Sequence, residues 1–316
     1  MTHTIAPPDD LPVVEGRYTV HAPLGQVGWF RTGGHAEILF KPLHLKDLQS
    51  FLAQYSAHKP LSILGVLSNS IIRDGGVDGV VIRLGREFAG IAPIDDHVLY
   101  VGAAALDVNV AEAAAAYNLA GLEFLCGIPG SIGGALALNA GAYGGELKDC
   151  LVRADFVDRA GNLHSLTADG LKMAYRHSEI PSGWIAVGAA LQARPGKRED
   201  IIARMNEIRT KRSASQPIRA QTGGSTFKNP DAQALEEVGL DPATKAWQLI
   251  DAVGGRGLTM GGAQMSEQHA NFMINTGTAT AADLEALGEE IRRRVRDRFS
   301  YDLHWEIARI GKSAAA

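Results

Sequence analysis

The chain has 316 residues, of which 46% are hydrophobic and 21% are charged, and its formal net charge is −4. This length suggests two or three domains with a sizeable core, and the acidic balance argues against nucleic acid as the main partner. No apolar run approaches the roughly 20 residues that a membrane-spanning helix needs, so no membrane span is expected.

The cysteines and the start of the chain indicate a reducing compartment. Cys126 and Cys150 lack metal-ligand spacing, and we expect two buried free thiols. Among the ten histidines, no pair has ligand spacing with a third supporting group, so no metal site is expected. The first residues lack the basic region and apolar core of a signal peptide, which favours a cytoplasmic protein.

The first part of the chain predicts a small α/β unit over residues 15–90, after a Pro- and Asp-rich segment, residues 1–14, that we expect to be poorly ordered. Alternating and helical spacings predict strands and one helix, in chain order at 37–41, 43–58 (the helix), 61–64 and 79–84. The stretch ILGVLSNSIIRDGG, residues 63–76, follows the second strand. A Gly- and Ser-containing turn after a strand commonly brings main-chain amides to a phosphate.

A second unit is expected over residues 91–213. It contains the densest glycine cluster of the chain, at 127–146, after an Ala-rich helix that we expect to end at a Gly121 cap. The other expected elements are strands from Val98 and at 151–158, 163–166 and 185–193, with a turn at Gly161–Asn162, and a basic helix at 198–213.

A third unit is expected over residues 214–312, after the break at Pro217. Helices are predicted near 243–253 and at 281–299, the second with a capping box from Thr280 and Asp283. One face of this last helix is apolar and the other should carry ion pairs: the apolar residues are Leu284, Leu287, Ile291 and Val295, and the pairs are Glu289–Arg293 and Glu290–Arg294. The ending LHWEIARIG reads as an alternating strand.

Seven motifs occur in one order between residues 28 and 311. They are WFRTGG, LGVLSNSIIRDGGVDGVVIRL, GIPGSIGGALALNAGAYGGE, YRHS, GGSTFKNP, GGAQMSEQHANFMIN and WEIARIG. This set resembles the UDP-N-acetylenolpyruvoylglucosamine reductase (MurB) family, in its shorter type that lacks an extra substrate loop. The resemblance implies an α+β protein: a two-subdomain FAD-binding fold of the vanillyl-alcohol-oxidase (PCMH) type, followed by a C-terminal α/β substrate domain.

The resemblance also implies an activity. NADPH would reduce a non-covalently bound FAD, which would reduce UDP-N-acetylglucosamine enolpyruvate to UDP-N-acetylmuramate in peptidoglycan precursor synthesis; a monomer is expected. Two alternatives stay open. One is another FAD oxidoreductase of the same fold, which would not carry GGSTFKNP or the WEIARIG ending. The other is a flavin-binding module with impaired turnover.

Three residues would carry the implied chemistry. As hydride reaches the carbon remote from the substrate carboxylate, negative charge develops beside that carboxylate and needs stabilisation and a proton. The resemblance assigns Arg176 to the carboxylate, Glu306, if protonated, to the intermediate, and Ser225 to proton donation. Taken alone, Ser225 would more commonly serve a turn or cap, Arg176 a surface salt bridge and Glu306 a solvent-facing strand position.

The remaining candidate residues divide into cofactor and substrate contacts. For FAD, they are Gly65, Ser68 and Asn69 at the pyrophosphate, Gly130, Ser131, Gly133 and Gly134 at the pyrophosphate or the isoalloxazine edge, Asn139, Gly141 and Tyr143 continuing that wall, and Tyr175 packing on flavin or substrate. For the sugar nucleotide, they are Lys228, Asn229, Gln264, His269 and Asn271. Glycines suit the first set because a side chain would block the approach of a ligand.

Leu67 departs from the family pattern, which is close to LGxGSN and has glycine at this position. A non-glycine residue in the left-handed region is strained by about 1–2 kcal/mol. Three outcomes are open: the leucine side chain turns away from the phosphates, FAD binds more weakly, or activity is impaired. Because Arg176, Ser225 and Glu306 are all present, we favour the first two.

Overall fold

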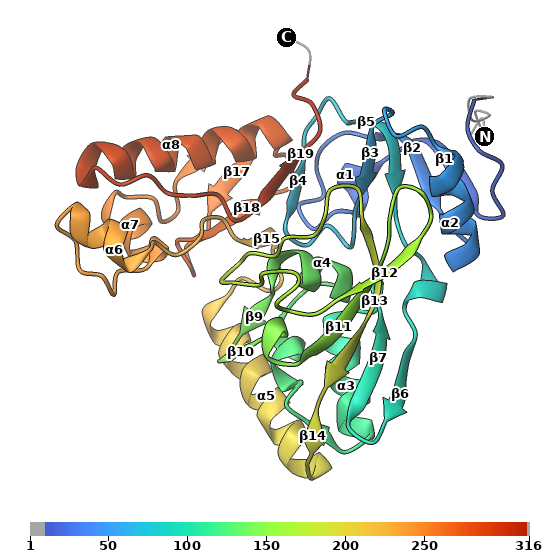
Figure 1. The fold of residues 1–316 in the computed structure, drawn as a ribbon. Helices are drawn as coiled ribbons and strands as arrows, with labels where there is room; N and C mark the ends of the chain where they lie inside the picture. Colours follow the sequence, from blue (N-terminus) through green and yellow to red (C-terminus); the bar gives the residue numbers. More distant parts are fainter. Residues whose placement is uncertain (1–9, 315–316) are drawn as a thin grey trace. The chain divides into compact units, whose positions relative to one another are not determined.

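The structure is a computed structural model that describes residues 10–314, and the chain divides into two compact units (Figure 1). The first comprises Met1–His21, Glu37–Gly65 and Asp78–Arg212; the second comprises Ala22–Ala36, Val66–Val77 and Ser213–Ala316. Residues 1–9, part of the segment expected to be poorly ordered, lie outside the described residues. Over the described part of the chain, no helix is long and apolar enough to cross a membrane.

The first unit begins with a four-stranded sheet in the order β1-β2-β5-β3. Its strands are β1 (Arg17–Ala22), β2 (Ala36–Lys41), β3 (Leu61–Ile63) and β5 (Val77–Ile82). The helix α2 (Leu45–Gln54) begins where the His44 ring accepts a hydrogen bond from the Asp47 main-chain N–H, at 3.1 Å. Its apolar face buries Leu48 and Phe51 in one cluster with Phe40 of β2, so helical spacing and burial agree.

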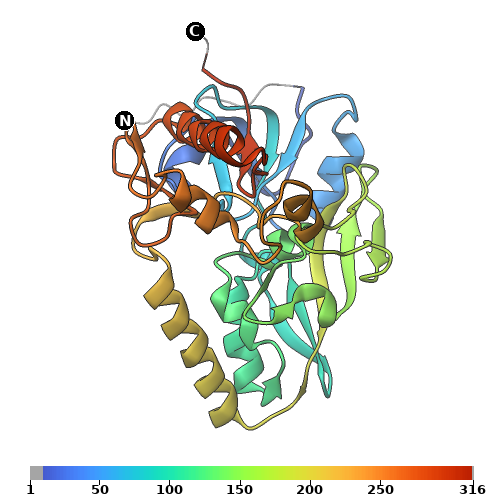
Figure 2. The ribbon, with the colours of Figure 1, turned by 90° about the vertical axis from the view of Figure 1, so that its left-hand side faces the viewer.

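A second sheet of the first unit is antiparallel, with the order β12-β11-β13-β7-β6. Its strands are β6 (Ile91–Asp95), β7 (Val98–Gly102), β11 (Leu151–Val157), β12 (Leu163–Leu166) and β13 (Ile185–Gln192). Figure 2 shows α5 (Arg198–Ser215) beside α3 (Asp107–Ala116), and residues of both helices line one shallow groove. Leu99, Val110 and Met205 join these elements in one core.

Short elements complete the first unit. They are α4 (Ile132–Leu138), the 3-10 helices η1 (Arg86–Phe88), η2 (Glu123–Gly127) and η3 (Leu147–Asp149), and the strand pairs β8 (Leu119–Ala120) with β14 (Arg194–Pro195) and β9 (Gly141–Ala142) with β10 (Gly145–Glu146). Cys126 and Cys150 are buried free thiols, as expected.

The prediction that the Ala-rich helix ends at Gly121 is wrong. The helix α3 ends at Ala116, with Tyr117 as its cap and Asn118 in the left-handed region at φ 56°. The chain then forms β8, whose pairing with β14 satisfies its main-chain groups outside the helix. By contrast, Gly161 lies in the predicted turn at φ 84° between the predicted strands β11 and β12.

The second unit has a four-stranded sheet in the order β15-β18-β17-β16. Its strands are β15 (Gln221–Ser225), β16 (Thr259–Met260), β17 (Ala263–Met265) and β18 (Phe272–Asn275), and α8 (Ala281–Phe299) packs on it (Figure 1). The other elements are α1 (Leu24–Val27), α6 (Ala232–Glu237), α7 (Ala246–Ala252), and the parallel strands β4 (Ser70–Ile72) and β19 (Ala308–Ile310). Helices and largely antiparallel sheets thus make up an α+β chain, as expected.

The last helix matches its predicted bounds and apolar face. Thr280 and Asp283 form the predicted capping box, and the four predicted core residues are buried: Leu284, Leu287, Ile291 and Val295. Glu290 pairs with Arg294 at 2.8 Å, as predicted. The predicted Glu289–Arg293 pair is wrong. Arg293 pairs with Glu290 and Asp297 instead, and Glu289 pairs with Arg309, which lies beyond the helix.

Candidate active site

The glycine-rich turn before α4 forms a rigid edge in the first unit. The Ile132 N–H donates to the Ala105 carbonyl at 3.0 Å, and the Gly133 N–H donates to the Ala103 carbonyl at 2.8 Å. A Cβ at Gly130 would lie 2.7 Å from Oδ2 of Asp107, so this position has no room for a side chain. These contacts within the protein define the main-chain conformation of the turn.

Gly65 lies against the same turn and leaves one side of it open. A Cβ at Gly65 would be 3.2 Å from Oγ of Ser131, whereas a Cβ at Gly134 would contact nothing within 4 Å. Both glycines are exposed, while Ser131 is buried. The first unit therefore presents a cradle of exposed main chain between two glycine motifs, and this arrangement fits the FAD that the sequence predicts.

Asn139 connects this cradle with the segment that carries Arg176. Its side chain is buried: Nδ2 donates to the Ala174 carbonyl at 3.0 Å and to Oε2 of Glu146 at 3.1 Å, and Oδ1 accepts from the Lys148 N–H at 2.9 Å. The side chain thus links two loops, which favours a structural role over direct contact with FAD. The predicted contact itself stays a prediction.

Arg176 is held in a defined position within the first unit. Its Nη2 donates to the Gly141 carbonyl at 3.1 Å, and its guanidinium lies 5.3 Å from the centre of the Tyr175 ring. Its main chain has φ 51°, a strained left-handed conformation for a non-glycine residue.

Tyr143 packs its ring on Gly127, where a Cβ would lie 2.5 Å from Cε2 of the tyrosine.

Asp107 is a buried group that the sequence analysis did not single out. Both of its carboxyl oxygens are buried without a hydrogen-bond partner among the described residues. Burial raises the pKa of Asp107 well above the ordinary value for an aspartic acid, which favours the neutral acid. An acidic residue at the start of a helix commonly lies in solvent, so the burial of Asp107 has no signal in the local sequence.

Leu67 adopts the conformation that a glycine would favour. Its φ is 57°, and its side chain is only 4% exposed in the second unit. A Cβ at Gly28 would lie 3.6 Å from Cβ of Leu67, and the Leu67 carbonyl accepts from the Trp29 N–H at 3.3 Å. The leucine side chain is thus packed inward, at the cost of a strained main chain.

Asn69 follows in the same loop and contacts the end of the chain. Its Nδ2 donates to the Glu306 carbonyl at 3.0 Å, and its own carbonyl accepts from the Ala308 N–H at 3.0 Å. These bonds extend the parallel pairing of β4 with β19. The predicted phosphate contacts of Asn69 and the half-buried Ser68 stay predictions.

The second unit brings Ser225 and Glu306 together. Ser225 ends β15, and the carbonyl of the next residue, Thr226, accepts from the Glu306 N–H at 2.9 Å. A Cβ at Gly223 would lie 2.5 Å from Cε2 of Phe30, which explains one glycine of GGSTF. Gly224 has φ 82° and open space around it, so the main chain turns freely just before Ser225.

Asn271 supports this arrangement from the turn before β18. Its Oδ1 accepts from the Phe227 N–H at 3.0 Å, its Nδ2 donates to the Phe227 carbonyl at 2.8 Å, and its main-chain carbonyl accepts from the Thr226 N–H at 2.7 Å. The side chain is almost fully buried. These bonds favour a structural role for Asn271 rather than the predicted sugar-nucleotide contact.

The other substrate candidates are distributed around the second unit. Burial lowers the pKa of His269, and its Nδ1 accepts from the Asn271 N–H, and both favour the neutral ring. Oδ1 of Asn229 accepts from the Ala246 N–H at the start of α7. Nε2 of Gln264 lies 3.5 Å from the Gly257 carbonyl. The Lys228 residue is half-buried. Their roles toward a substrate stay predictions.

Comparison with known proteins identifies the family. The profile described as "UDP-N-acetylenolpyruvoylglucosamine reductase, C-terminal domain" matches residues 216–310, and that of an FAD binding domain matches residues 36–167. UDP-N-acetylenolpyruvoylglucosamine reductases of Paramagnetospirillum magneticum and Parvibaculum lavamentivorans are 53% and 54% identical to this chain over 303 residues, covering 96% of it and 95% and 94% of those proteins.

A solved structure agrees with these matches. The crystal structure of UDP-N-acetylenolpyruvylglucosamine reductase (MurB) from Thermus caldophilus has a TM-score of 0.77 and 31% identity, and the match covers 94% of this chain and 100% of that one. The expected fold, an FAD-binding part followed by the family's C-terminal domain, is confirmed. The chain belongs to the UDP-N-acetylenolpyruvoylglucosamine reductase (MurB) family.

Proposed function

We propose that this chain reduces UDP-N-acetylglucosamine enolpyruvate to UDP-N-acetylmuramate with NADPH, as a step of peptidoglycan precursor synthesis. Family membership and the matched FAD binding domain support this activity. FAD, when bound, carries the hydride between the two substrates. Its main-chain cradle would be provided by Gly65, Gly130, Ser131, Gly133 and Gly134.

Ser225 donates the proton to the substrate carbon, and Glu306 stabilises the charge that develops beside the substrate carboxylate. One observation carries this assignment: the main chain at Thr226 joins the Ser225 strand directly to Glu306, through a hydrogen bond of 2.9 Å. Two groups that act on adjacent atoms of one substrate need such a fixed separation. Gly224 gives Ser225 the freedom to approach the substrate.

Arg176 binds the substrate carboxylate. Its guanidinium is a permanent cation, held by the Gly141 carbonyl and the Tyr175 ring. A pre-positioned cation stabilises developing negative charge without reorganising during the reaction. We assign the FAD subdomains to residues 15–90 and 91–213 and the substrate domain to 214–312, in a cytoplasmic monomer.

Two half-reactions test the proposal. The FAD-loaded protein is reduced with NADPH, and its flavin absorbance is then followed as the enolpyruvyl sugar nucleotide is added. Ser225→Ala should accept electrons from NADPH normally, yet form roughly a hundredfold less product, because the proton donor is gone. Normal product formation in this variant would show that Ser225 is not the donor.

The same assay separates the alternative functions. An oxidase of the same fold would pass electrons to oxygen and ignore the sugar nucleotide. A flavin-binding module without turnover would bind FAD and carry out neither half-reaction. The GGSTF segment beside Glu306 favours the reductase over both alternatives.

A further inference from the structure

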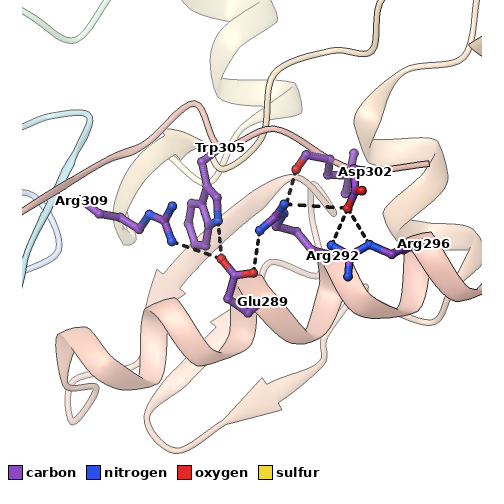
Figure 3. Close-up of polar contacts among 7 residues, drawn as sticks. Glu289, Arg292, Arg296, Asp302, Trp305 and Arg309 are labelled. Atoms are coloured by element: carbon purple, nitrogen blue, oxygen red, sulfur yellow. Dashed lines mark hydrogen bonds and ion pairs between the residues drawn. The ribbon is translucent and has the colours of Figure 1, made fainter. Parts of the chain in front are cut away.

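Trp305, which precedes Glu306, is anchored on α8 (Figure 3). Its indole N–H donates to Oε1 of Glu289 at 2.8 Å. The indole also lies directly on Gly288, where a Cβ would be 2.1 Å from the ring carbon Cη2. The centre of the indole ring is also 5.1 Å from that of the Phe227 ring, two residues after Ser225. The indole therefore contacts both the helix and the segment that continues from Ser225.

Glu289 is the centre of a network that holds this segment on both sides of Glu306. Its Oε2 accepts from Nη1 of Arg292 at 2.7 Å, and its Oε1 accepts from Nη1 of Arg309 at 3.1 Å (Figure 3). The Arg309 guanidinium lies 4.7 Å from the centre of the Trp305 ring. The Arg292 Nε also donates to the Leu303 carbonyl at 2.8 Å, three residues before Glu306.

The charges of this network favour an ionised Glu289. Burial would raise the pKa of Glu289, but the Trp305 hydrogen bond and the Arg292 and Arg309 charges lower it overall. The side chain of Glu289 is 45% exposed, and ion pairs at this exposure contribute little to stability. The consequence of the network is therefore geometric, because it fixes where the chain lies around Glu306.

We propose that Glu289 and Trp305 are positioning residues for Glu306. This inference rests on the role proposed for Glu306. The Glu306 N–H is held by the Thr226 carbonyl, and its carbonyl is held by Asn69. The anchored indole adds a side-chain constraint to these main-chain bonds, directly before Glu306. A catalytic carboxyl must be held within about 0.5 Å of its working position by the packing of its neighbours.

The test compares variants of the FAD-loaded protein in the two half-reactions. Trp305→Phe removes the N–H donor together with the ring carbons that lie on Gly288, and Glu289→Ala removes the acceptor of the indole hydrogen bond. Both should slow flavin reoxidation by the enolpyruvyl sugar nucleotide about tenfold, while flavin reduction by NADPH and the flavin spectrum are unchanged. The double variant should lose less than the sum of the two single losses, because both single variants remove the contact between the indole and Glu289.

Glu290→Ala is the matched control. Glu290 lies on the same helix and pairs with Arg293 and Arg294, so its removal deletes a comparable set of ion pairs. Its half-reactions should match those of the unmodified protein. Reoxidation at this control rate in both Trp305→Phe and Glu289→Ala would overturn the inference.

Two further variants complete the test. Glu289→Gln keeps an acceptor for the indole and should retain a faster reoxidation than Glu289→Ala; equal rates would overturn the claim that the indole contact matters.

Glu306→Gln tests the role on which the inference rests. If it reoxidises normally, the proposed function of Glu306 fails; if it is slow while the Trp305 and Glu289 variants are normal, only the positioning inference fails. Thermal unfolding confirms that each variant is folded.

Discussion

The side-chain amide of Asn69 donates a hydrogen bond of 3.0 Å to the main-chain carbonyl of Glu306, 237 positions further along the chain. The next strand pair, β4 with β19, is parallel and continues this contact. A loop that sequence motifs place near a phosphate is therefore also part of the support of Glu306. Within the second unit, the position of Glu306 depends on this loop as well as on the GGSTF segment.

Removing the Asn69 donor should affect both stability and catalysis. Asn69→Ala and Asn69→Asp lose the N–H donor, and the second keeps the shape of the side chain. Each should lower the free energy of unfolding by about 1 kcal/mol, because the Glu306 carbonyl loses a partner. Urea titration measures the stability, and flavin reoxidation by the sugar nucleotide should also slow. Unchanged reoxidation in both variants would contradict a supporting role for Asn69.

Replacing Leu67 by glycine sets two effects against each other. The change relieves the strain of a left-handed non-glycine residue, about 1–2 kcal/mol. It also removes a buried leucine side chain, whose burial contributes about 1.5–3 kcal/mol. Gly also gains conformational freedom in the unfolded chain, so Leu67→Gly should lower the free energy of unfolding by about 1–2 kcal/mol. FAD occupancy, measured from the flavin absorbance per protein, should be equal or higher. Lower occupancy would show that the buried leucine supports FAD binding.

The predictable parts of the molecule are those with local signals. The helix α8 has its capping box and its buried stripe as predicted, because caps and periodicity are encoded within the helix. The end of α3 differs from the prediction, because an alanine run carries no stop signal and residues 119–120 pair with β14. The ending LHWEIARIG also differs: β19 covers only Ala308–Ile310, and Trp305 forms an isolated bridge with Phe227.

The candidate site depends more strongly on tertiary contacts. The partners of Glu289 differ from the prediction because Trp305 and Arg309, 16 and 20 positions away, compete with Arg293 on the next turn. The three proposed catalytic residues were predicted only through the family resemblance. Their spacing in the sequence carries no geometric information, because distant strand pairing determines which segments meet.

The buried carboxyl of Asp107 should make stability depend on pH. Its pKa in the folded chain lies well above the ordinary 3.8, so the folded state keeps a proton that the unfolded state releases. Above the unfolded pKa, stability contributed by this group falls by about 1.4 kcal/mol per pH unit until the folded pKa is reached. The Asn side chain of Asp107→Asn cannot lose a proton. The free energy of unfolding of this variant, relative to that of the unmodified protein, should therefore rise as the pH increases from 4 towards 7, at first by about 1.4 kcal/mol per pH unit. Urea titrations at several pH values measure the difference, and a constant difference would contradict a raised pKa.

A methyl group at Gly288 on α8 should displace the Trp305 ring. Gly288→Ala gains about 1 kcal/mol of helix propensity, but its Cβ would lie 2.1 Å from the Trp305 ring. Displacing a packed indole costs about 1–3 kcal/mol, so the net change should be destabilising or near zero. Because the displaced ring carries the contact to Glu289, flavin reoxidation by the sugar nucleotide should slow while flavin reduction by NADPH is unchanged.

Ala286→Gly, on the same helix, controls for helix propensity alone, with an expected loss of about 1 kcal/mol and no change in either half-reaction. A Gly288→Ala protein with normal reoxidation would show that the indole can shift without moving Glu306.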